Sequence, residues 1–205
     1  MPINREAVRK LIETDEKLRT LNFGTFGRFK ESSLDEMSDD EQKGYHLVMD
    51  ARGMVPGPYK IWLQNRKLIE VMLQMGLHYQ SESTLSKAEI EIAVSLTSGK
   101  LAAAYSSYEH EWIAEVVGGL PAEKVQALIA GLHTSFEDPR QQIVYELTST
   151  LLEPRIVPSG LFHRAIELLG HAGLTDLIAF IGYFTTVSLT LRAYDVPASA
   201  VGLRR

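Results

Sequence analysis

The chain has 205 residues, enough for one sizeable domain, and its 45 % apolar and 23 % charged content is ordinary for a globular protein. A net charge of −5 without any block of Lys and Arg argues against a nucleic-acid-binding surface. The absence of cysteine excludes disulfides, thiolate nucleophiles and Cys-ligated metals.

The location of the protein is predicted from its apolar segments. The first residues, Met1–Glu6, contain no apolar run of the kind found in secretory signals. The most apolar stretch is the fifteen residues Leu177–Leu191, which is shorter than the ~20 residues that a membrane span needs. We therefore interpret this stretch as a central buried helix, and we expect a cytoplasmic protein that does not enter a membrane.

The spacing of apolar residues predicts helices along the chain, and hence an all-α fold. The first helix is expected over 4–21 and is followed by a loop over 22–37. Ser38 and Glu41 form a capping box that begins the next helix, and this helix ends at Gly53.

Pro56-Gly57-Pro58 interrupts the chain after this helix. We place a domain boundary there, between an N-terminal helical extension over 1–54 and a main helical domain over 55–197. A short tail over 198–205 completes the chain.

The apolar spacing predicts helices in the main domain as well. No segment alternates apolar and polar residues for long enough to predict a strand. The expected helices cover 59–80 (as one or two helices), a segment after the capping box at Ser86, 106–117, 121–130, 138–153, 158–170 and 174–194. Glu115-Val116-Val117-Gly118 is similar to Glu167-Leu168-Leu169-Gly170, 52 residues later. This similarity predicts a weak internal repeat of a helical unit.

Two residues nineteen positions apart carry the strongest chemical signal. Glu91 lies between Ile90 and Ile92 in an apolar helix, where an ionised carboxylate is rarely buried without a partner. His110 lies in the next helix, beyond a possible joint at Ser98-Gly99-Lys100. Two antiparallel helices joined there would bring the carboxylate and the imidazole together as a proton relay.

The helix of His110 also predicts a ligand-binding face. Ala103, Ser106 and His110 are spaced i, i+3 and i+7, so they share one side of the helix, and the small residues leave room for a ligand. Tyr105 and Tyr108 flank this stripe, where they either donate hydrogen bonds to the ligand or simply pack.

Simpler interpretations stand beside these. Glu91 could lie on the solvent face of an amphipathic helix, and a single His is usually structural. A metal site is disfavoured, because the side chains of Glu109-His110-Glu111 point about 100° apart and no His-x-x-x-His or Glu-x-x-His spacing occurs. A Ser106 nucleophile is disfavoured because there is no Gly-x-Ser-x-Gly motif. We expect neither a metal nor a cofactor.

Leu85-Ser86-Lys87-Ala88-Glu89-Ile90-Glu91, followed by His110, Ala114 and Gly118, resembles the carboxymuconolactone decarboxylase family in its broad sense, which includes the alkylhydroperoxidase D-like proteins. The resemblance covers about residues 55–197. It extends to Gly57-Pro58-Tyr59, Leu177–Phe184 and Tyr194–Pro197.

The resemblance implies an alkylhydroperoxidase D-like multi-helix fold, assembled as a homo-oligomer, either a trimer or a hexamer. In the peroxidase branch of that superfamily, a Cys-x-x-Cys precedes the His, at the positions of Ala103 and Ser106. This cysteine-less chain is therefore not a thiol peroxidase of that type. Another branch carries Tyr-Glu-Trp where this chain has Tyr105-Ser106-Ser107, so its site carries over only in part.

The resemblance further implies a cofactor-free lyase or isomerase that acts on a small carboxylated lactone or a related intermediate of aromatic degradation. His110 would be the general acid/base, Glu91 would orient it, and polar groups of the small-molecule ligand would be bound by Ser106, Tyr105 and Tyr108 beside Ala103. Arg66, Arg140 or an Arg of a neighbouring subunit is a candidate to hold the substrate carboxylate. The alternative is a catalytically vestigial helical oligomer or a small-ligand binding protein, in which Glu91 and His110 remain as a buried structural pair.

Overall fold

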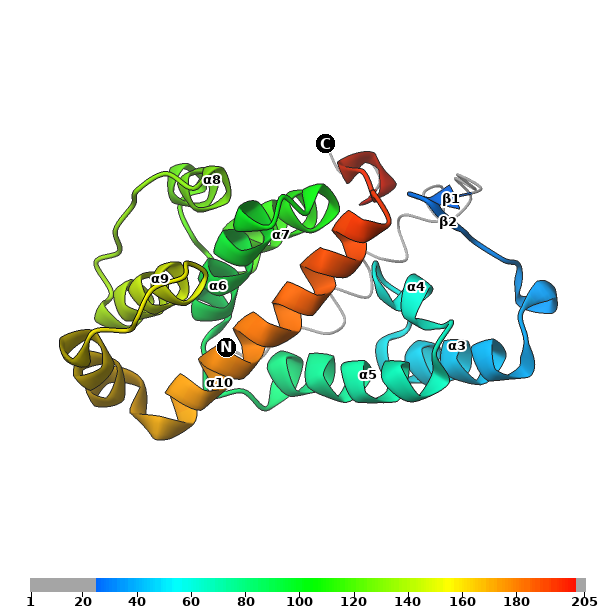
Figure 1. Ribbon diagram of the computed structural model, residues 1–205, viewed down its shortest axis with the longest axis horizontal. Coiled ribbons are helices and arrows are strands. Elements are labelled where there is room, and N and C mark those ends of the chain that lie inside the picture. Colours follow the sequence, from blue (N-terminus) through cyan, green and yellow to red (C-terminus); the bar gives the residue numbers. More distant parts are fainter. Residues whose placement is uncertain (1–24, 202–205) are drawn as a thin grey trace.

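The computed structural model describes residues 25–201, of which 71 % are helical, with eight α-helices and one two-stranded sheet (Figure 1). The all-α class predicted from the sequence is confirmed. The helices are α3 (Asp39–Arg52), α4 (Tyr59–Trp62), α5 (Arg66–Ser81), α6 (Lys87–Lys100), α7 (Ala104–Val116), α8 (Ala122–Ala130), α9 (Pro139–Leu151) and α10 (Ser159–Ala193).

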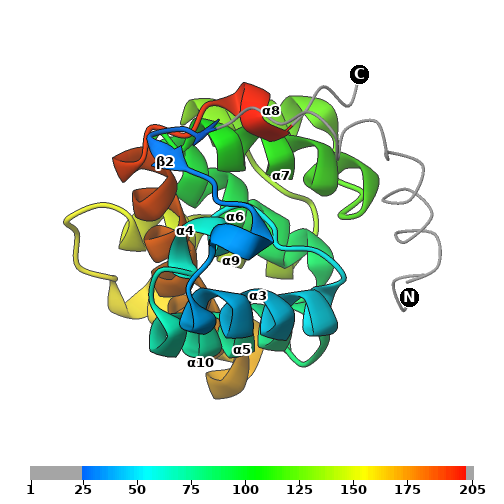
Figure 2. The ribbon, with the colours of Figure 1, turned by 90° about the vertical axis from the view of Figure 1, so that its right-hand side faces the viewer.

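The segment before α3 contains a small hairpin as well as loop. Strands β1 (Thr25–Phe26) and β2 (Phe29–Lys30) pair antiparallel, and a 3-10 turn, η1 (Leu34–Glu36), follows. The backbone N–H of Arg28 donates to the carbonyl of Tyr194 at 2.6 Å, so the hairpin is held against the end of α10 (Figure 2). The helix predicted over 4–21 lies outside the described residues.

Local sequence signals set the ends of α3, α5 and α6. The capping boxes at Ser38 and Ser86 are both present, and α3 ends at Gly53 in the left-handed conformation, as predicted. The region 59–80 forms two helices, because the side chain of Asn65 accepts a hydrogen bond from the backbone N–H of Leu68 and begins α5 there.

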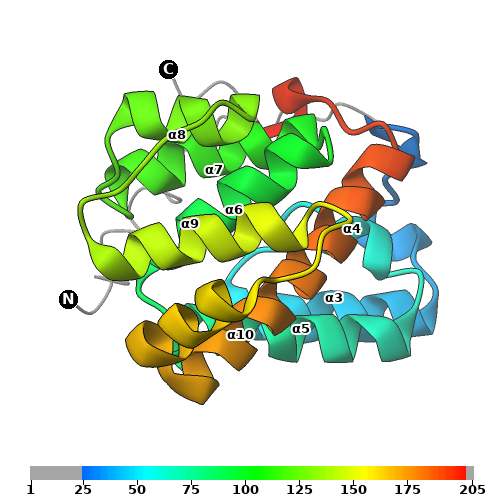
Figure 3. The ribbon, with the colours of Figure 1, turned by 60° about the vertical axis from the view of Figure 1, so that its left-hand side comes forward.

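Helix α6 is the centre of the fold. Every residue from Glu89 to Ser98 is buried, and the helix packs against α7, α8, α9 and α10 (Figure 3). A helix that is covered on all sides is a core helix, not an amphipathic surface helix. This excludes the interpretation in which Glu91 lies on a solvent face, because its side chain is 0 % exposed.

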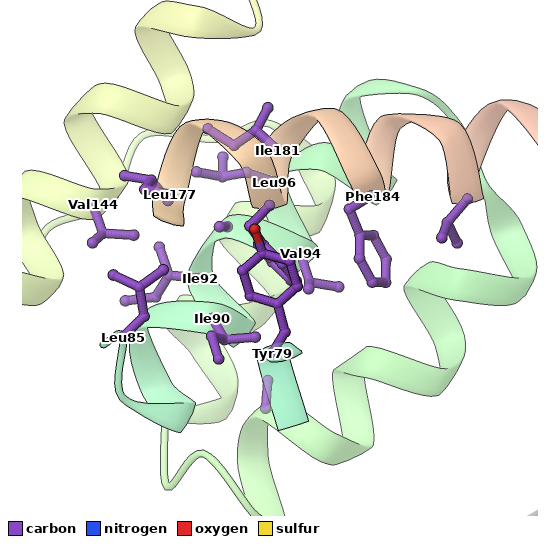
Figure 4. Packing of buried hydrophobic residues seen from close by; sticks show 14 of the residues in the cluster. Tyr79, Leu85, Ile90, Ile92, Val94, Leu96, Val144, Leu177, Ile181 and Phe184 are labelled. Atoms are coloured by element: carbon purple, nitrogen blue, oxygen red, sulfur yellow. The ribbon is translucent and has the colours of Figure 1, made fainter. Parts of the chain in front are cut away.

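The core runs between α6 and α10. Figure 4 shows side chains of both helices interleaved, with others from α5 and α9 around them. The labelled apolar side chains of α6 and α10 are Ile90, Ile92, Val94, Leu96, Leu177, Ile181 and Phe184. Phe26 and Val48, which precede the boundary predicted at residue 55, belong to the same buried cluster. The described part of the extension therefore packs on the main domain, and the division into 1–54, 55–197 and 198–205 stays a prediction.

Helix α10 is divided by a kink. Gly170 has φ 69° and ψ 175°, a conformation that glycine adopts without strain, so the segment forms the two helices predicted over 158–170 and 174–194. In the predicted repeat, the counterpart Gly118 lies where α7 has ended, whereas Gly170 lies between two helices that continue.

Helix α10 is also long and apolar enough, by length and composition, to cross a membrane. The core helix of a folded domain passes the same test, and 44 % of its most apolar window is buried within the protein. A cytoplasmic location therefore stays a prediction.

Close packing between α6 and α8 gives a test of the fold. A Cβ at Gly99 would lie well inside the contact distance of the Ile129 carbonyl oxygen, so we expect Gly99→Ala to lower the free energy of unfolding by about 2 kcal/mol. Gly182→Ala is the matched control, because that helical glycine faces open space and gains helix propensity, with an expected change within about 1 kcal/mol. Denaturant unfolding measures both, and equal effects of the two substitutions would contradict the packing.

Candidate functional site

The site is built where α6 turns back into α7. The joint lies at Leu101–Ala103, slightly after the predicted position, with Ala102 in the left-handed region at φ 51° and the N–H of Ala103 bonded to the carbonyl of Ser98 at 2.9 Å. The pairs Glu91–His110 and Ser98–Ser106 then face each other, which shows that the two helices run antiparallel.

The structure brings Glu91 and His110 together, as their spacing predicted. Nδ1 of His110 lies 2.7 Å from Oε2 of Glu91, which is hydrogen-bond distance. The side chain of Glu91 is 0 % exposed and that of His110 is 18 % exposed. The pair therefore reaches from the core to the surface, with the imidazole at the outer end.

Lys87 is a third member of this group, and it was not among the predicted site residues. Its Nζ forms an ion pair with Oε1 of Glu91 at 2.5 Å. Its side chain is 35 % exposed. The signal was in the sequence, because Lys and Glu at i and i+4 lie on one face of a helix.

These neighbours decide the charge of Glu91. Burial acts to raise the pKa of its carboxyl, but the charge and hydrogen bond of His110 and the charge of Lys87 outweigh burial, so the pKa lies below its usual value. An ionised carboxylate only accepts hydrogen bonds, so Nδ1 of His110 must carry the proton between them. Glu91 thus selects one tautomer of His110.

The other ring nitrogen of His110 is then the one that can exchange a proton. Within residues 25–201, Nε2 has no hydrogen-bond partner. Phe184 of α10 packs against the ring edge to face, with 5.0 Å between the ring centroids. An imidazole that is oriented in this way and has one free ring nitrogen is suited to general acid/base chemistry.

The small residues of the predicted stripe are less accessible than we expected. Ser106 is 2 % exposed and its Oγ lies 2.7 Å from Oγ of Ser98, so its hydroxyl is bonded within the interface of α6 and α7. Ala103 is 1 % exposed at the N-cap of α7. Neither residue presents a free group to a ligand in this conformation, and their predicted binding role remains untested.

The two tyrosines lie at the margin of the site. Tyr105 is partly buried and packs edge to face on Phe26, with ring centroids 5.3 Å apart, so the N-terminal hairpin covers it. Tyr108 is also partly buried. Their predicted contact with a ligand stays a prediction.

The two arginines proposed for a substrate carboxylate are engaged elsewhere. Nε of Arg140 donates to Oε1 of Glu89 at 2.7 Å, and its Nη1 donates to the carbonyl of Leu168 at 2.8 Å. The hydrogen bond to Glu89 raises the pKa of Arg140. Arg66 forms an ion pair with Glu70 at 2.6 Å. Arg140 is thus a structural clamp among α6, α9 and α10.

A second polar cluster, around Asp176, was also missed by sequence reasoning. Its carboxylate accepts from the N–H of Thr84 at 2.8 Å and from Ser83 Oγ at 3.1 Å, and lies 2.9 Å from His78 Nε2. Burial acts to raise the pKa of Asp176, but these hydrogen bonds lower it overall. With so many donors already bound, this cluster fastens the α5–α6 loop to α10.

Two pockets of the described chain lie away from the Glu91–His110 pair. One, of about 230 Å³, is bounded by the segment after β2, α3 and α4, and its lining includes Glu31, Tyr45 and Lys60. The other is a shallow depression between α9 and the start of α10. Among the residues that the structure describes, no group of three His, Asp or Glu could hold a metal ion.

No protein-family model matches the chain, and no curated protein sequence is similar to it. The resemblance to the carboxymuconolactone decarboxylase family therefore depends on the motif residues alone.

The buried carboxylate predicts a pH-dependent stability. Because the pKa of Glu91 is lowered on folding, its charge stabilises the folded protein above the unfolded value near 4.5, and this contribution is lost as pH falls through the lower folded pKa. We expect Glu91→Gln to cost about 3 kcal/mol of unfolding free energy near neutral pH and less below pH 4.5.

Denaturant unfolding of both proteins across this pH range measures the difference. Glu123→Gln, which removes an exposed carboxylate, is the control and should change little. A cost of Glu91→Gln that does not vary with pH would contradict the assignment of a buried ionised carboxylate.

Proposed function

We propose that the chain is a carboxymuconolactone decarboxylase-like enzyme, a cofactor-free lyase or isomerase that acts on a small carboxylated lactone or a related ring acid. The observation that carries this proposal is the fully buried Glu91 carboxylate 2.7 Å from Nδ1 of His110. Glu91 holds the ring, and the partly exposed His110 performs the proton transfer. A homo-oligomer, trimer or hexamer, in the cytoplasm is part of the proposal.

The chemistry follows from the two nitrogens of His110. In a decarboxylation, the bond between the ring carbon and the carboxylate breaks, carbon dioxide leaves, and the electron pair stays on the carbon. Protonated Nε2 then gives its proton to that carbon, and the neutral imidazole takes up another proton from solvent. Glu91 stabilises the imidazolium form through Nδ1–H, and such proton transfer contributes ~10²–10⁴-fold in rate.

The absence of cysteine separates this proposal from peroxidase chemistry. The two positions that carry thiols in the peroxidase branch are Ala103 and Ser106, and Ser106 is bonded to Ser98. The Glu91–His110 geometry is therefore present without a thiol for it to serve, and in this proposal the proton goes to the substrate itself.

The second candidate is a helical protein that keeps the pair for stability alone. The buried Ser98–Ser106 bond and the location of the two described pockets away from His110 favour it. In that case removal of His110 would leave a buried carboxylate paired only with Lys87. The substitution would then lower the stability of the protein, and there would be no activity for it to change.

Turnover separates the two candidates. We expect the purified protein to release carbon dioxide from carboxymuconolactone or a related lactone, and His110→Asn to reduce this at least ~10²-fold. Asn keeps a side-chain N–H for Glu91 but cannot transfer a proton, so the fold should be retained.

Thermal unfolding of the same variant is the control, together with His110→Ala, which removes the N–H as well. A His110→Asn variant as active as the parent would contradict the role of His110. No turnover on any lactone of the panel would contradict the decarboxylase assignment for those substrates and favour the second candidate.

A further inference from the structure

We propose that Lys87 is a positioning residue of this site, which holds Glu91 as a carboxylate so that His110 keeps its proton on Nδ1 and presents Nε2 as a base. The inference rests on the proposed function for its catalytic meaning, but its physical content can be measured without a substrate. It assigns Lys87 a role that the Glu–His pair alone does not include.

The geometry places Lys87 and His110 on the two oxygens of one carboxylate. Nζ of Lys87 lies 2.5 Å from Oε1, and Nδ1 of His110 lies 2.7 Å from Oε2. Lys87 precedes Glu91 by one helical turn, so both are fixed by the same rigid segment of α6. One oxygen of the carboxylate is thus held by a residue of its own helix, and the other oxygen is held by a residue of α7.

No other described charge competes for this carboxylate. Two other carboxylates have partners of their own. Glu89, also in α6, accepts from Arg140 of α9, and Asp176 of α10 accepts from the α5–α6 loop. From α10 the group that faces the imidazole is the uncharged ring of Phe184. Among the described residues, the charges that lower the pKa of Glu91 are those of His110 and Lys87.

The loss of Lys87 would change what Glu91 can do. Burial of a carboxyl favours its neutral form, and a neutral carboxyl can donate its O–H. If Glu91 donates to Nδ1, that nitrogen becomes the acceptor and the ring proton moves to Nε2. The nitrogen that faces outward then no longer serves as a base in the neutral imidazole.

The ring nitrogens of His110 report this directly. In long-range ¹H–¹⁵N spectra of protein labelled at histidine, we expect the neutral form of His110 to show a protonated Nδ1 and an unprotonated Nε2. Lys87→Met should shift the population toward the form protonated at Nε2, and Lys87→Arg, which keeps the charge, should restore the parent spectrum. The Glu91 carboxyl carbon should titrate at least about one pH unit higher in Lys87→Met.

Lys100→Met is the matched control, because it removes a Lys–Glu ion pair at the other end of α6, with Glu153, and should leave the His110 signals unchanged. A parent spectrum with the proton on Nε2 would overturn the proposal even if Lys87→Met does not fold. So would a Lys87→Met spectrum identical to that of the parent.

Activity measurements separate this proposal from the proposed function. Where the lactone panel gives turnover, Lys87→Met should shift the acidic limb of the pH–rate profile to higher pH. Lys87→Arg should restore the profile of the parent. Where the panel gives none but the spectra behave as expected, the decarboxylase assignment fails and the role of Lys87 stands. An unshifted profile in an active Lys87→Met variant would overturn the role of Lys87 and leave the decarboxylase assignment intact.

Discussion

The structure depends on one constraint, which is that a carboxylate lies in the buried part of α6, the central helix of the fold. An ion in that position is stable only when opposite charge and hydrogen bonds replace water. Glu91 obtains both, from Lys87 one turn earlier and from His110 across the interface. The antiparallel return of α7 supplies the second of these partners, because it brings Nδ1 of His110 to 2.7 Å from the carboxylate.

A second buried carboxylate on the same helix shows what a purely structural solution looks like. Glu89 and Glu91 are two residues apart, so they point about 200° apart around α6. Glu89 is bound by the guanidinium of Arg140, whose remaining donors reach carbonyls such as that of Leu168, and this clamp stays charged at any ordinary pH. Glu91 is bound by a histidine, the side chain that titrates near neutral pH. The difference in partner, not in burial, distinguishes the candidate site from the clamp.

The Glu91–His110 pair by itself does not identify a reaction, because proteins of one fold can keep the same residues and act on different substrates. In this chain the face of α7 next to the relay carries hydroxyl and methyl groups, and one hydroxyl, that of Ser106, is bonded to Ser98. In the proposed function, His110 transfers a proton at this face, and the substrate carbon accepts it.

The sequence by itself determined the features that depend on neighbours along the helix. The period of apolar residues predicted the helices, the capping boxes at Ser38 and Ser86 predicted two of their starts, and the nineteen-residue spacing predicted the meeting of Glu91 with His110 across one turn of chain. Only the tertiary structure decided which residues that are far apart in the sequence become hydrogen-bond partners. Arg140 is 51 residues from Glu89, and Asp176 is 98 residues from His78, so nothing local selects them. Hydrogen bonds of buried polar groups are settled by which helices pack together, and helical periodicity does not contain that information.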